Sequence, residues 1–126
     1  MPAPALLARE AVYLVARLRL WTPARWAALA ESEGPSRADV VHHLAQSLVD
    51  AAGEAPVPMP RLDSPLALPD QLAVAADDLV RHGPSDEVAL GAVAHLLAHR
   101  RELLGDDVPV ALTARLGGRP VICPDA

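Results

Sequence analysis

The stretch Ser85 to Gly105, SDEVALGAVAHLLAHRRELLG, predicts the longest helix of the chain and indicates the kind of fold that must surround it. Ser85 is a typical N-cap, Asp86 and Glu87 stand at the positive end of the helix dipole, and Gly105 is a typical stop. At about 100° per residue, the apolar side chains of this helix cover an arc of roughly 200°. A helix that is apolar over so wide an arc has to be covered on most sides, which favours a helical bundle.

Two histidines, His95 and His99, stand four residues apart on this helix, and Glu102 lies beside them at one edge of the apolar arc. Residues four apart share a helix face, and this is the spacing by which two imidazoles reach one divalent ion. The same spacing arises when two histidines only pack at the boundary of the core. A metal site also needs a third protein ligand, so both interpretations stay open.

Apolar side chains at helical spacing predict further helices over residues 5–20, 22–33, 36–52 and 69–82. In the first of these helices, Arg9, Glu10 and Arg17 are expected to point away from the core. Trp26 and Leu29 are the expected core contacts of the second helix. The core-facing residues expected in the first helix are Leu7, Ala11, Leu14, Val15 and Leu18.

Prolines crowd the segment 54–69, which therefore cannot form a regular helix or a central strand. We expect it to run extended across the bundle and to join two helices that are not antiparallel neighbours. Residues 109–116 predict a short helix with a glycine stop, or alternatively a hairpin that pairs 110–115 with 119–122. Together the patterns predict an all-α fold, a compact bundle of about four to five helices in a single domain over residues 1–126.

Composition excludes several classes of protein. The single cysteine, Cys123, rules out an intramolecular disulfide and a cysteine-rich zinc site. The net charge of −5 disfavours nucleic-acid binding, which needs a cationic surface. No apolar run approaches the roughly 18 residues of a membrane span, and the chain lacks the pattern of a signal peptide, so a cytoplasmic location is expected.

The segment Arg37-Ala38-Asp39-Val40-Val41-His42-His43-Leu44 resembles the second-helix motif of DinB-type proteins and of the mycothiol-dependent maleylpyruvate isomerase-like proteins. These families are four-helix bundles that hold a divalent metal. The resemblance implies His43, His95 and His99 as metal ligands, with Asp39 or Glu102 as a possible addition. On its own helix, however, His43 falls on the polar side.

The main functional hypothesis is a non-catalytic module that self-associates or binds a protein partner, with no cofactor and no contact with nucleic acid or membrane. The wide apolar arc of Ser85–Gly105 and the scarcity of aromatic residues motivate it, because an apolar excess indicates a covered surface. The alternative is a metal-dependent bundle that binds zinc or nickel through His43, His95 and His99. A DNA-binding regulator is the third hypothesis.

Overall fold

The computed structural model describes residues 1–29, 33–53, 57–105, 112, 115 and 116. Within these residues the chain forms helices and no strand, which confirms the all-α class; Leu29 and Ser36 make an isolated β-bridge. The elements are α1 (Ala3–Leu18), α2 (Pro23–Ala27), α3 (Arg37–Ala52), a 3-10 turn η1 (Pro65–Ala67), α4 (Leu68–Arg81) and α5 (Asp86–Leu104). No helix of the described residues is both long and apolar enough to cross a bilayer.

Side-chain caps start three of the helices where the sequence predicts them. The hydroxyl groups of Thr22, Ser36 and Ser85 each accept a hydrogen bond from the backbone N–H three residues on, at 3.1–3.2 Å. These bonds satisfy N–H groups that have no partner within the helix. Gly105 ends α5 in the left-handed conformation, with φ of 73°, which glycine adopts without steric cost.

The second helix is shorter than the sequence predicts, since α2 ends at Ala27 rather than near residue 33. Ala28 is already extended, and its carbonyl oxygen accepts a hydrogen bond of 2.8 Å from the N–H of Arg37. This bond turns the chain directly into α3. Trp26 is buried as predicted, whereas Leu29 is exposed because it lies in the turn beyond the helix.

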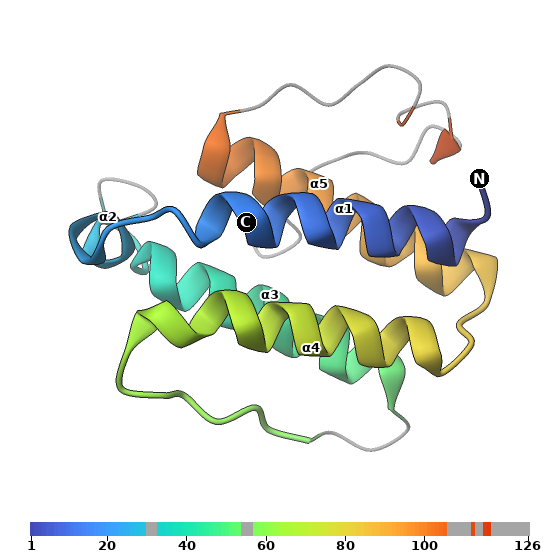
Figure 1. Ribbon diagram of the computed structural model, residues 1–126, viewed down its shortest axis with the longest axis horizontal. Coiled ribbons are helices and arrows are strands. Elements are labelled where there is room, and N and C mark those ends of the chain that lie inside the picture. The colour runs from blue at the N-terminus through green and yellow to red at the C-terminus, as the bar shows by residue number, and fades with distance from the viewer. Residues whose placement is uncertain (30–32, 54–56, 106–111, 113–114, 117–126) are drawn as a thin grey trace.

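Among the described residues, the long helices α1, α3, α4 and α5 form the bundle. Neighbouring helices run both parallel and antiparallel (Figure 1). Helix α1 packs on α4 and α5, and α3 packs on the same two helices from the other side. The pairs α3/α4 and α1/α5 are parallel, whereas α1/α4 and α3/α5 are antiparallel. A parallel pair of consecutive helices requires a connection as long as the whole bundle. The proline-rich segment between α3 and α4 is that connection.

The proline-rich connection is held on the polar side of α3 by side-chain hydrogen bonds. The amide of Gln46 binds its backbone twice, donating to the Val57 carbonyl at 2.9 Å and accepting from the Met59 N–H at 2.6 Å. Nε2 of His42 donates to the Met59 carbonyl at 3.1 Å. Backbone groups that the prolines leave out of regular structure are thus paired, as partly buried polar groups need to be.

Leucine, valine and alanine side chains from all four long helices fill the core, together with Trp21 and Trp26. The five positions predicted to face the core from the first helix are buried. Glu10 is also buried, so the prediction that it points outward is wrong. Most of residues 109–122 lie outside the described residues. Where they are described, the N–H of Leu116 donates to the Leu112 carbonyl at 3.0 Å, the spacing of an α-helical turn.

Candidate functional site

The histidine pair of α5 is formed as the helical spacing predicts. The ring centroids of His95 and His99 are 4.7 Å apart, and Nδ1 of His99 lies 2.9 Å from the carbonyl oxygen of His95. A carbonyl oxygen only accepts, so Nδ1 of His99 donates in this contact. His95 is half-buried, whereas His99 is only 1% exposed.

The other predicted metal ligands do not complete a metal site with this pair in the described part of the chain. His43 is exposed on α3, Glu102 is exposed on α5, and Asp39 accepts a hydrogen bond of 2.7 Å from Arg61 of the proline-rich connection. Within the described ranges no three histidine, cysteine, aspartate or glutamate side chains come together as a metal site would require. His43 therefore does not join His95 and His99 in a ligand set.

The carboxyl group of Asp39 has a lowered pKa. Partial burial raises this pKa, but hydrogen bonds from Ser36 and the guanidinium of Arg61 outweigh burial and hold it below the ordinary aspartate value. Both partners favour the ionised carboxylate. Asp39 thus stabilises the start of α3 and anchors the proline-rich connection.

A buried ion pair joins α1 to α5. Nη1 of Arg100 lies 3.1 Å from Oε2 of Glu10, whose side chain is 6% exposed. The Arg100 guanidinium carbon also lies 4.1 Å from the ring centroid of Tyr13, within the range of a cation–π contact. The hydroxyl oxygen of Tyr13 accepts a hydrogen bond of 2.8 Å from Arg17. The charges of Glu10 and Arg100 at this seam between α1 and α5 are therefore paired and largely shielded from solvent.

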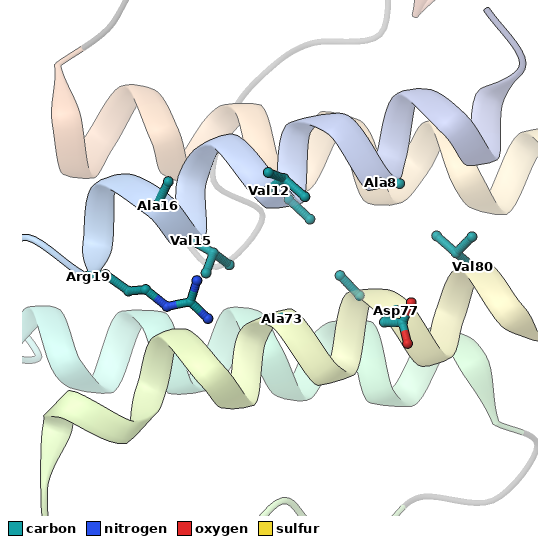
Figure 2. A pocket seen from close by; sticks show the side chains of 10 residues that line it. Ala8, Val12, Val15, Ala16, Arg19, Ala73, Asp77 and Val80 are labelled. Atoms are coloured by element: carbon teal, nitrogen blue, oxygen red, sulfur yellow. The ribbon is translucent and has the colours of Figure 1, made fainter.

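The opposite side of α1 has an open, apolar groove shared with α4 (Figure 2). The groove has a volume of about 220 Å³. It exists because alanines line the seam, and their short side chains leave the space between two helices unfilled. The apolar side chains that line the groove are Ala8, Ala11, Val12, Val15, Ala16, Ala73, Ala76 and Val80.

Val12 stands out in this groove because its side chain is 70% exposed in the middle of a helix. Figure 2 places it between Ala8 and Ala16 along α1, and all three residues line the groove. The charged residues that line the groove are Arg19 and Asp77. Each of these has a partner in its own chain, Arg19 with Asp70 and Asp77 with Arg81, both at 2.9 Å and both exposed.

The apolar arc of α5 is largely covered within the chain. Among the described residues of α5, Val88 is the one large apolar residue with an exposed side chain, and its exposed fraction is 39%. Helices α1 and α3, which come from distant parts of the chain, pack on α5 and supply this cover. No protein-family model matches the chain, and no match was found among curated proteins or solved structures.

Proposed function

We propose that this chain is a non-catalytic helical module that works by binding protein, either another copy of itself or a partner, through the groove between α1 and α4. The observation that carries the proposal is Val12, a large apolar side chain left 70% exposed beside a concave, alanine-lined seam. Apolar surface of this shape on a small domain is typical of an interaction site.

The free energy gained by covering apolar side chains favours the same groove. Covering one valine side chain contributes about 1.5–3 kcal/mol, and the groove offers further apolar area from α1 and α4 at no conformational cost to the backbone. The ion pairs at its two ends are exposed, and such pairs contribute about 0–1 kcal/mol each. Rearranging Arg19 or Asp77 toward a bound partner therefore costs little.

The burial of the polar groups supports a role without catalysis. Glu10 and His99 are the buried residues of the described chain that carry titratable side chains, at 5% and 1% exposed. A general acid or base has to reach the substrate within hydrogen-bonding distance. Neither residue meets solvent unless the helices part, and Glu10 already neutralises Arg100.

Sedimentation velocity over a range of concentrations tests the proposal with two matched variants. Val12→Glu places a charge in the groove, and Val74→Glu places the same charge on an α4 position that is 60% exposed and outside the groove. We expect wild type and Val74→Glu to exceed the 13.2 kDa of one chain as concentration rises, or to bind the same partner. Val12→Glu is expected to lose that association. A wild type that stays monomeric, and whose bound proteins are the same as those of Val12→Glu, would refute the proposal.

A further inference from the structure

We infer that the occupant of the α1–α4 groove is a second copy of this chain, bound antiparallel about a two-fold axis that lies in the interface and crosses the groove at Val12. This inference rests on the proposed function, since it assumes that the groove is the interaction surface. It adds the identity of the partner, the direction in which it lies and the charged residues that set its register.

The first argument is the order of side chains along α1. Ala8, Val12 and Ala16 are spaced four residues apart and form one row on the helix face that borders the groove (Figure 2). The row is small, large, small, so it reads the same in both directions. When one of two such rows is reversed, Ala8 of each copy lies opposite Ala16 of the other, and the two Val12 side chains meet at the axis.

The second argument is charge. Figure 2 shows Arg19 toward one end of the groove and Asp77 toward the other, with Val12 between them. A two-fold rotation at Val12 exchanges the two ends. It therefore places Arg19 of each copy opposite Asp77 of the other copy and forms two equivalent ion pairs across the interface. An unrelated partner would need to present this pattern independently, whereas a second copy presents it by symmetry.

The size of the face indicates how strong this dimer is. Helix α1 is about 24 Å long and two packed helices are about 20 Å wide, which gives roughly 500 Å² per copy. A total of roughly 1,000 Å² is at the lower limit of specific interfaces. We therefore expect a reversible dimer with a dissociation constant in the micromolar range or weaker.

Charge-reversal variants test this arrangement. Their association is measured by sedimentation equilibrium at low salt. Arg19→Asp alone creates two acidic contacts across the interface, and Asp77→Arg alone creates two basic ones. Each variant is expected to associate at least about tenfold more weakly than wild type, since like charges oppose docking. An equimolar mixture of the two variants is expected to regain wild-type association, because every cross-copy pair is then of opposite sign.

Further variants separate an effect on association from an effect on folding. The double variant Arg19→Asp/Asp77→Arg restores both pairs within a homodimer and is expected to associate like wild type. If a charge reversal impairs folding, Arg19→Gln and Asp77→Asn replace it. Each is expected to weaken association, and their mixture, which restores one of the two ion pairs, is expected to recover it in part. Circular dichroism of each variant reports folding separately from association.

The possible failures are distinguishable. If wild type dimerises and Val12→Glu prevents it, but the mixture of reversed charges does not recover, the antiparallel arrangement is overturned while the groove remains the interaction surface. If wild type is monomeric and Val12→Glu abolishes binding of a different protein, the second copy is overturned and the proposed function stands. If a wild-type dimer is unaffected by Val12→Glu, both fail.

Discussion

Glu10 and Val12 lie two residues apart on α1, yet the charged residue is buried and the apolar residue is exposed. Glu10 is 5% exposed and faces α5, where Arg100 and Tyr13 surround the charge. Val12 is 70% exposed at the edge of the alanine-lined groove with α4. The comparison teaches that one helix of this bundle has a sealed polar seam and an open apolar seam. The sealed seam stabilises the fold, and the open seam is where binding is proposed.

Removing one member of the sealed pair is expected to have the largest effect on stability. Glu10→Ala leaves Arg100 largely buried without its carboxylate, and we expect the free energy of unfolding to fall by about 3 kcal/mol. Asp70→Ala removes an ion pair of similar length that is exposed, and it should cost less than about 1 kcal/mol. Urea denaturation measures both. Equal losses in the two variants would contradict the distinction between the seams.

A double replacement sharpens this test. Glu10→Leu/Arg100→Leu removes both charges and fills the seam with apolar side chains of comparable volume. We expect its stability to be within about 1 kcal/mol of wild type, because no unpaired charge is then buried. If the double variant is as unstable as Glu10→Ala, the loss comes from packing rather than from the unpaired arginine.

His99 provides the next largest effect and separates packing from metal binding. His99→Ala removes a buried ring and its hydrogen bond to the His95 carbonyl, and we expect a loss of about 2 kcal/mol. Treatment of wild type with a chelator should leave its urea midpoint unchanged, because the packing account needs no ion. A midpoint that falls in wild type but not in His99→Ala after chelation would show that a metal stabilises the pair.

The smallest expected effect concerns Asp39, whose lowered pKa links stability to pH. Because the pKa is lower in the folded chain than in the unfolded chain, the carboxylate stabilises the fold above the unfolded value and this contribution disappears as pH falls through the folded value. Asp39→Asn should therefore be less stable than wild type at pH 7, by under about 1 kcal/mol. The urea midpoints of the two proteins should converge as pH falls through the lowered pKa of Asp39. A difference that persists below that pKa would contradict the role of the charge.

Features that depend on local chemistry could be predicted from the sequence. Ser36 and Ser85 cap their helices with their own hydroxyl groups, and Gly105 stops α5 through its own backbone conformation. The facing of His95 toward His99 follows from helical spacing alone. The proline-dense connection could be predicted as extended because proline cannot donate a backbone hydrogen bond.

Features that depend on contacts between residues distant in the sequence could not be predicted from it. A carboxylate at the position of Glu10, four residues from Leu6 and from Leu14, signals a charge within the apolar stripe, but nothing local identifies Arg100 as its partner. The contact of Gln46 with the backbone of the proline-rich connection is equally invisible in the sequence. The sequence predicts that the wide apolar arc of α5 must be covered, but not which helices cover it, since these come from other parts of the chain.

Backbone amide chemical shifts, recorded on one sample at low and at high concentration, test the central claim most directly. The account predicts that the shifts of Val12, Ala16 and Ala73 change with concentration, while those of His95 and His99 stay constant. Changes confined to α5, with the α1–α4 groove unaffected, would contradict it.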